Sequence, residues 1–312
     1  MPDPIKWKSK IILVKPEATY GVDPAPTGAA NAMLLTDVTL SPMEGQDVSR
    51  NVEYPYLGAQ EELPTGLHVV MTGNFELVGS AALGTAPAWG PLIRACAAAE
   101  VITPATKVEY TPISDAHESV AVHFHIGGTR HVILGGRGNI VFGVDAQGIP
   151  VGRLTLTGLF ATPTEVARPT PTLTGWKTPK VASKANTPVY TIDGVAFVGR
   201  DFSFDLGNQV VPRLLFNSER VIITDKAESV SMTVEAVPLT TYDPYTKANT
   251  PGARVAIAVE HDVATRKVRF DIATAQQKRP AGLSQTDNIA EWGLGFVPLP
   301  SAGNDQWKIT LT

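Results

Sequence analysis

The sequence predicts a mainly β protein made of two tandem, similar β-sandwich or β-barrel units, each flanked by a short α-helix. Alternating apolar and polar segments, separated by glycine- and proline-rich turns, dominate the 312 residues. Each half of the chain carries one compact helical stretch among these strands. The order of elements in residues 34–160 also recurs in residues 189–312. Repeated units of this kind are more typical of rings and arrays than of active sites.

Residues 1–33 are expected to form an N-terminal arm with little regular structure, because prolines and glycines interrupt them from residue 16 onward. The apolar residues 11–14 favour docking of the arm on another surface. The start of the arm is basic and contains a tryptophan. The arm residues expected to contact a neighbouring subunit are Lys6, Trp7, Lys8 and Lys10.

The first unit, residues 34–160, begins with an expected strand at 34–40 and resumes with an alternating strand at 67–78. The excursion between them is acidic and also aromatic, so we expect a long hairpin or loop that projects from the sheet. An ordinary acidic surface loop is the alternative. The residues that give the excursion this character are Glu44, Asp47, Arg50, Glu53, Tyr54, Tyr56, Glu61 and Glu62.

A helix is expected within residues 87–99, where Trp89, Leu92, Ile93 and Cys96 fall on one stripe at helical spacing. Pro91 is compatible with the first turn of that helix. Strands are expected at 119–126 and 151–160, with turns at paired glycines between them. Residues 161–188 are expected to be a linker that its prolines stiffen, and Trp176 in its middle needs a surface to pack on.

The second unit, residues 189–312, repeats this order. Strands are expected at 201–206 and 229–237, separated by an excursion that is shorter than the first. A helical stretch at 242–249 and a strand at 254–260 follow, and hairpins end the unit at 289–299.

Composition excludes several classes of protein. The net charge is −4 and charged residues make up 18% of the chain, against about 25% in an average domain. A conventional nucleic-acid binder would instead show a basic patch. The single cysteine, Cys96, cannot form an intrachain disulfide and is interpreted as a small buried apolar residue. No apolar run reaches the ~20 residues of a membrane span, and the N-terminus lacks a secretory signal, so folding in a cytoplasm is expected.

Three motifs could carry chemistry, and each has a simpler interpretation. His123 and His125 share one strand face, as two metal ligands would, but a polar sheet face explains them better. Gly135-Gly136-Arg137-Gly138-Asn139 leads into a strand, so glycines that permit a bulge explain it better than a phosphate loop. His261-Asp262 has no nucleophile signature beside it. The chain is therefore expected to be a non-enzyme without cofactors.

The chain resembles a known family through several phrases spread along it. They are Lys15–Pro24 (KPEATYGVDP), Asp37–Gly45 (DVTLSPMEG), Gly84–Cys96 (GTAPAWGPLIRAC), Asp205–Val210 (DLGNQV) and Pro300–Asp305 (PSAGND). The whole chain is similar to the tail tube (major tail) protein of long, non-contractile-tailed bacteriophages, the siphophages. The phrases indicate kinship rather than mechanism.

The resemblance implies the tail-tube fold, in which inner sheets of ring-mates join edge to edge into one large barrel around a channel for DNA. Closure of the barrel removes exposed sheet edges. It also implies a place in the tail of the virion, with assembly in the bacterial host cytoplasm and no membrane contact. The implied partners are other copies of the chain, the tail tip or distal tail protein, the tail terminator protein and the tape measure protein in the lumen.

Rings of the family usually contain six similar units, so two units per chain predict three chains in a pseudo-six-fold ring; six full chains are the alternative. A basic lumen would hold double-stranded DNA through counterion release, so the lumen is expected to be neutral to negative. The excursion is expected to reach an adjacent ring and help to stack the tube. A receptor- or carbohydrate-binding β-sandwich of the virion is the alternative function, and an enzyme with a β-barrel active site is a third.

Overall fold

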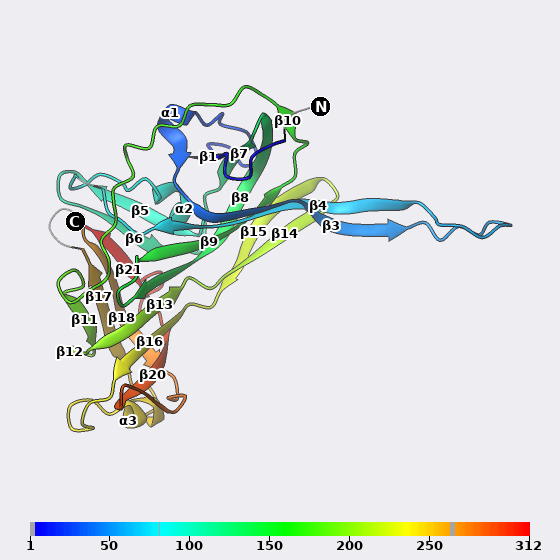
Figure 1. Cartoon of the computed structure of the whole chain (residues 1–312). Coiled ribbons are helices and arrows are strands. Elements are labelled where there is room, and N and C mark those ends of the chain that lie inside the picture. Colours follow the sequence, from blue (N-terminus) through cyan, green and yellow to red (C-terminus); the bar gives the residue numbers. More distant parts are fainter. Residues whose placement is uncertain (1–3, 81, 263–265) are drawn as a thin grey trace.

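The computed structural model describes residues 4–80, 82–262 and 266–312. The protein is mainly β, with 51% strand and 5% helix. All strands of the described residues except β14 and β15 belong to one large, curled antiparallel sheet. Figure 1 shows this curled body and one long hairpin, formed by β3 and β4, that projects far out of it.

The helices are short and the strands carry the architecture. The helices are α1 (Gly28–Asn31), α2 (Gly90–Arg94) and α3 (Pro244–Asn249). The strands are β1 (Lys10–Pro16), β2 (Ala32–Met33), β3 (Thr36–Ser49), β4 (Glu62–Glu76), β5 (Ala98–Thr103), β6 (Lys107–Pro112), β7 (Val120–Ile126), β8 (Thr129–Asp145), β9 (Val151–Leu159), β10 (Thr164–Glu165), β11 (Val189–Ile192), β12 (Val195–Ala196), β13 (Gly199–Asp205), β14 (Asn208–Leu215), β15 (Ser218–Lys226), β16 (Ser229–Glu235), β17 (Val255–His261), β18 (Val268–Gln277), β19 (Leu283–Thr286), β20 (Ile289–Pro298) and β21 (Lys308–Leu311).

The strands of the N-terminal half pair antiparallel in the order β3-β4-β9-β8-β7-β1. Alternation fixes which face is buried. On β4, Val69, Met71, Gly73 and Phe75 are buried, and the residues that alternate with them are half-buried. On β9, Leu154 and Leu156 are likewise buried and alternate with more exposed residues. A one-residue slip of either strand would turn these side chains to the other face, so the pattern holds the register.

The strands of the C-terminal half pair antiparallel in the order β13-β16-β20-β18-β17-β11. The short strand β19 follows β18 along the chain and pairs with the first residues of β20. The helix α3 follows β16, and its N-terminus is capped by Asp243, whose carboxylate accepts hydrogen bonds from the backbone N–H groups of Tyr245 and Thr246.

Strand β8 joins the two halves. Its C-terminal part pairs with β13, and Phe142 lies opposite Phe204 in this ladder. The two rings are stacked with centroids 6.2 Å apart, and Phe270 of β18 lies 5.3 Å from Phe142. Trp307 covers Phe204 at 5.7 Å. These side chains belong to one core that extends through both halves. A second link runs through β21, which pairs with both β18 and β6.

The two excursions predicted from the sequence are both hairpins, but they lie differently. The β3–β4 hairpin projects into solvent, whereas the β14–β15 hairpin lies against the N-terminal half (Figure 1). There the Nδ2 of Asn208 donates to the carbonyls of Cys96 and Gly138, at 2.8 and 3.0 Å. The Nζ of Lys226 donates to the carbonyls of Ala97 and Ile113, at 2.9 and 2.7 Å.

The predicted strands at 67–78, 119–126, 151–160, 201–206, 229–237, 254–260 and 289–299 are confirmed within a few residues. Two expectations were wrong. The arm is not irregular throughout, because residues 10–16 form β1, which makes a seven-residue ladder with β7. The helix expected within 87–99 ends at Arg94, because Ala97 adopts a positive φ of 57° and β5 begins at Ala98. In the predicted linker, the indole N–H of Trp176 donates to the carbonyl of Ala32 at 3.1 Å.

Replacing Phe142 by alanine should destabilise both halves at once, because the ring is fully buried between them. We expect a loss of about 3–5 kcal/mol in the free energy of unfolding, measured by urea denaturation. Phe216→Ala at the exposed turn of β14–β15 is the control and should change it by less than about 0.5 kcal/mol. Two separate unfolding transitions would contradict a shared core.

Candidate assembly interface

Several strands of the described residues pair on one side only, among them β5 and β12, and the open edges of β3 and β19 lie at the two ends of one long series of paired strands. Among the described residues, β3 forms its ladder with β4 on one side and β19 forms its ladder with β20 on one side. Each therefore presents a row of backbone N–H and C=O groups on the other side, which favours the addition of a further strand. Leu283, the first residue of the edge strand β19, is 68% exposed although its side chain is apolar.

The N-terminal arm lies beside the open edge of β3. The Nζ of Lys10 donates to the carbonyl of Val38 at 2.7 Å and lies 3.6 Å above the ring of Trp7. A groove of about 790 Å³ separates the arm from the strand, and both Trp7 and Lys8 line it together with residues 36–39. Lys6 is exposed nearby, and its carbonyl accepts from the N–H of Ser9. The predicted arm residues thus gather next to an open strand edge.

The predicted excursion residues are distributed along the projecting hairpin. Glu44 and Asp47 lie on β3, and Glu62 begins β4. Near the tip, four of the remaining residues form two local contacts. Arg50 pairs with Glu61 at 3.0 Å, Tyr54 stacks on Tyr56 with ring centroids 5.2 Å apart, and Glu53 is exposed beside them. The basic arm lies at the other end of β3, so the structure does not bring the two predicted sets together.

A continuous ribbon of strands runs between the two open edges, in the order β3-β4-β9-β8-β13-β16-β20-β19. One of its faces packs on the core. Residues directly opposite each other in a ladder share a face, so the registers define the other face. Its hydroxyl-bearing members include Thr39, Thr72, Thr155, Ser203, Ser231, Thr233 and Ser284.

Acidic side chains dominate the charges on this polar face. The acidic members are Asp37, Glu76, Asp145, Asp201, Asp205, Glu235 and Glu291, and the basic ones are Arg137, Arg153, Lys278 and Arg200, whose guanidinium pairs with Glu291 at 2.6 Å. Arg137 is turned away from solvent, because its guanidinium donates to the carbonyls of His117, Glu118 and Val221. Sequence alone could not assign this face, since it depends on which strands are neighbours.

The residues of the three candidate chemical motifs make structural contacts or occupy bulges. His123 and His125 share a face, with ring centroids 6.2 Å apart, and the Nε2 of His123 lies 2.9 Å from a carboxylate oxygen of Asp23. The glycines at 135 and 136 lie at register shifts in both ladders of β8, so they are bulge residues. His261 contacts the carbonyl of Lys180. Within the described ranges, no group of three or more His, Cys, Asp or Glu side chains could hold a metal ion.

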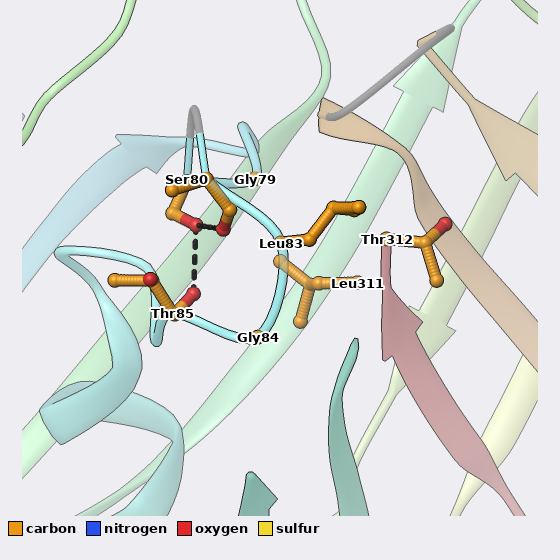
Figure 2. Close-up of a pocket in the computed structure, with 8 residues that line it drawn as sticks. Gly79, Ser80, Leu83, Gly84, Thr85, Leu311 and Thr312 are labelled. Atoms are coloured by element: carbon orange, nitrogen blue, oxygen red, sulfur yellow. Dashed lines mark hydrogen bonds between the residues drawn. The ribbon is translucent and has the colours of Figure 1, made fainter. Parts of the chain in front are cut away.

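A second depression lies where residues 79–80 and 82–85 approach the end of β21 (Figure 2). The hydroxyl of Ser80 donates to the carbonyl of Thr85 at 2.7 Å and so closes this loop on itself. The depression holds about 0 Å³ of space for a water-sized molecule. It is a packing irregularity and has no room for a ligand.

Comparison with known proteins gives no family: no family model matches the chain, and no curated protein matches it. A search of the helices in the described residues finds none with the length and apolar character needed to cross a bilayer.

The buried histidines should make stability depend on pH. Burial, followed by the nearby His123, Arg130 and Arg168, lowers the pKa of His125 from 6.5 to about 4. The unfolded chain therefore binds a proton below pH 6.5 that the folded chain rejects, so stability is lost as the pH falls from 6.5 towards 4. One pKa unit is worth about 1.4 kcal/mol, so we expect a loss of roughly 2 kcal/mol from His125 after allowance for solvent screening.

Thermal unfolding followed between pH 7.5 and 4.5 measures this effect. Burial also lowers the pKa values of His117, His123, His131 and His261, so part of the slope should persist in a His125→Gln variant. The variant should nevertheless show a shallower slope than the parent protein. An equal slope would mean that His125 is not a source of the pH dependence.

Proposed function

We propose that this chain is the subunit of a bacteriophage tail tube, in which rings stack around a channel that conducts DNA from the virion into the host. One observation carries the proposal. The same strand order occurs twice in the chain, the two copies are joined edge to edge, and one open edge remains at each end of the joined ribbon. Such a ribbon can close only by pairing with further copies of itself.

The correspondence between the halves extends to each connection. The order β3-β4-β9-β8-β7-β1 becomes β13-β16-β20-β18-β17-β11, and α2 and α3 each follow the second strand of that order. The short strand β2 pairs with β1 as β12 pairs with β11. These parallels support two tandem copies of a tail-tube unit within one chain, with the first copy beginning at β1.

Sequence supports the same correspondence residue by residue. Asp37-Val38-Thr39-Leu40 on β3 matches Asp201-Phe202-Ser203-Phe204 on β13. Each leading aspartate binds the next strand, Asp37 through the side chain of Asn74 at 3.1 Å and Asp201 through the N–H of Thr233 at 3.2 Å. The segments around the helices match as well, WGPLIRA at 89–95 and YDPYTKA at 242–248.

The join inside the chain provides a template for the join between chains. Strand β19 corresponds to the C-terminal part of β8. Ser284 of β19 lies opposite Glu291 of β20, and Gly143 of β8 lies in the same way opposite Val151 of β9, the strand equivalent to β20. Within the chain, Gly143 lies opposite Ser203 of β13. Since Ser203 corresponds to Thr39, the proposal pairs Ser284 of one chain with Thr39 of the next. The exposed Leu283 would then meet Leu40, as Phe142 meets Phe204.

Three chains of this kind would close a barrel with six similar units. Each ribbon contributes eight strands, so the ring would have three times eight, or about 24. At about 4.8 Å between strands and a tilt of about 40°, such a barrel measures about 48 Å across its backbone. Porins with 16–18 strands already enclose an aqueous channel, so this lumen is wide enough for a DNA duplex.

The polar face of the ribbon would line that lumen. DNA carries about one negative charge per 1.7 Å of its axis and binds tightly wherever basic side chains replace its counterions. The carboxylates and hydroxyls of this face offer few such sites, so DNA would pass without sticking. The role is structural, not enzymatic, and the proposed partners are other copies of the chain, the proteins at both tube ends and the tape measure protein in the lumen.

Cysteines at Thr39 and Ser284 test the ring directly. Both side chains are exposed, and opposite residues of antiparallel strands lie within reach of a disulfide. We expect oxidation of the double variant to give dimers and closed trimers on denaturing gels, while buried Cys96 does not react. Thr39→Cys with Ser231→Cys is the control and should stay monomeric, because Ser231 lies on a central strand.

Electron microscopy of the assembled protein should show three chains per ring around an open channel. Six chains per ring would be consistent with a tube subunit but would refute the proposal that each chain supplies two of the six ring units. Discrete particles without a channel would favour a receptor- or carbohydrate-binding module instead.

Deletion of residues 46–60 should leave soluble rings that do not stack into tubes, because the projecting part of the β3–β4 hairpin is removed while the β3 edge at 36–41 is kept. Negative-stain microscopy and sedimentation separate rings from tubes. Tubes of normal length would rule out a stacking role for the hairpin.

A further inference from the structure

We propose that the base of the β3–β4 hairpin binds a second copy of this chain, on a surface formed by the end of α3 and the end of β18, with Glu44 facing Lys278. The inference rests on the proposed function and adds a specific partner surface to it. It concerns contacts within a ring, whereas the far part of the hairpin is assigned to stacking.

The β14–β15 hairpin is the template for this contact. It leaves β13 and returns to β16, as the β3–β4 excursion leaves the first strand of its unit and returns to the second. Its first residue, Asn208, donates to the carbonyls of Cys96 and Gly138, and its N–H donates to the Oδ1 of Asn139 at 3.0 Å. The base of this hairpin thus covers the end of α2 and the middle of β8.

The equivalent surface of the second unit is bare. The match of the helix segments equates Cys96 with Asn249 and Ala97 with Thr250. Cys96 and Ala97 are buried, whereas Asn249 and Thr250 are exposed. Equivalent elements build the two surfaces. Since a hairpin base covers the surface of the first unit, we expect a hairpin base to cover the surface of the second unit as well. The chain has one other hairpin of this kind, and it projects away from its own body (Figure 1).

Register identifies the residues that would meet. Leu40 corresponds to Phe204, and a count of four residues along the chain from each brings Glu44 to the place of Asn208, across a β-bulge of β3 between Ser41 and Glu44. On the receiving side, Asn139 lies opposite Thr155 of β9, and the N–H of Lys278 donates to Gly295 of β20. Thr155 of β9 and Gly295 of β20 hold equivalent places in the two halves. Gly152, three residues before Thr155, lies opposite Phe75, and Trp292, three residues before Gly295, lies opposite the equivalent residue Val234. Lys278 therefore takes the place of Asn139.

The substitutions on the two sides are complementary. Within the chain, the backbone N–H of Asn208 donates to the amide oxygen of Asn139; between chains, the carboxylate of Glu44 would instead meet the ammonium of Lys278. Both side chains are exposed in the isolated chain, as is Arg279 beside Lys278. In the described part of the molecule none of the three takes part in an ion pair. Opposite charges at equivalent places favour this partner and register over others.

Charge reversal tests the pair. Glu44→Lys or Lys278→Glu alone should raise the protein concentration needed for half-maximal ring assembly by at least about fivefold, because like charges then face each other. The double reversal should restore assembly to within about twofold of the parent protein. Glu53→Lys at the hairpin tip is the matched control and should leave ring assembly unchanged. Failure of the double variant to recover would overturn the pairing.

Cysteines at Glu44 and Lys278 provide a second readout that does not depend on affinity. Oxidation should link chains into trimers, and Glu53→Cys with Lys278→Cys should not. If Thr39 and Ser284 cross-link while Glu44 and Lys278 do not, the hairpin contact is wrong and the ring stands. If neither pair cross-links in folded, assembled protein, the ring proposal falls together with this one.

Discussion

The requirement that sheet edges be paired governs this structure. An unpaired strand exposes backbone groups that must find partners, and β8 meets that requirement for both halves. This strand extends over Thr129–Asp145 and pairs with β7 and β13 along one edge and with β10 and β9 along the other. Without the pairing to β13, each half would end in an open edge and the aromatic contact of Phe142 with Phe204 would be exposed. Among the edges that stay open in the described residues are those of β3 and β19, at the two ends of the ribbon.

The two halves carry the same strand order but have diverged where they meet. The N-terminal half has an additional hairpin, β5–β6, whose outer strand reaches β21 and through it β18. The C-terminal half has little between α3 and β17, and its helix remains more exposed. One join between the halves is therefore internal to the chain, and in the proposed ring the other join would form with a separate chain.

The sequence predicted what depends on local pattern. Alternation located β4, β9, β16 and β20, because each buries one face and exposes the other. It failed for β1, where neighbouring prolines and glycines obscured four buried residues in a row. It overextended α2, since the residues after Arg94 are good helix formers that tertiary packing holds in a turn and a strand. The open edges were beyond prediction, because they depend on which distant strands pair.

Open edges also carry a risk of indiscriminate pairing, and this chain limits the risk at both ends. At β3, the ammonium of Lys10 occupies the carbonyl of Val38 and Trp7 covers the groove beside it, so an incoming strand must displace the arm. Strand β19 has only four residues, and Pro280 with two cations precedes it. Short, charged edges of this kind resist general aggregation. In the proposed ring, a matching copy would bring an entire ladder and an acidic hairpin base at once, and these contacts would offset the displacement of the arm, whereas an unrelated strand would not supply them.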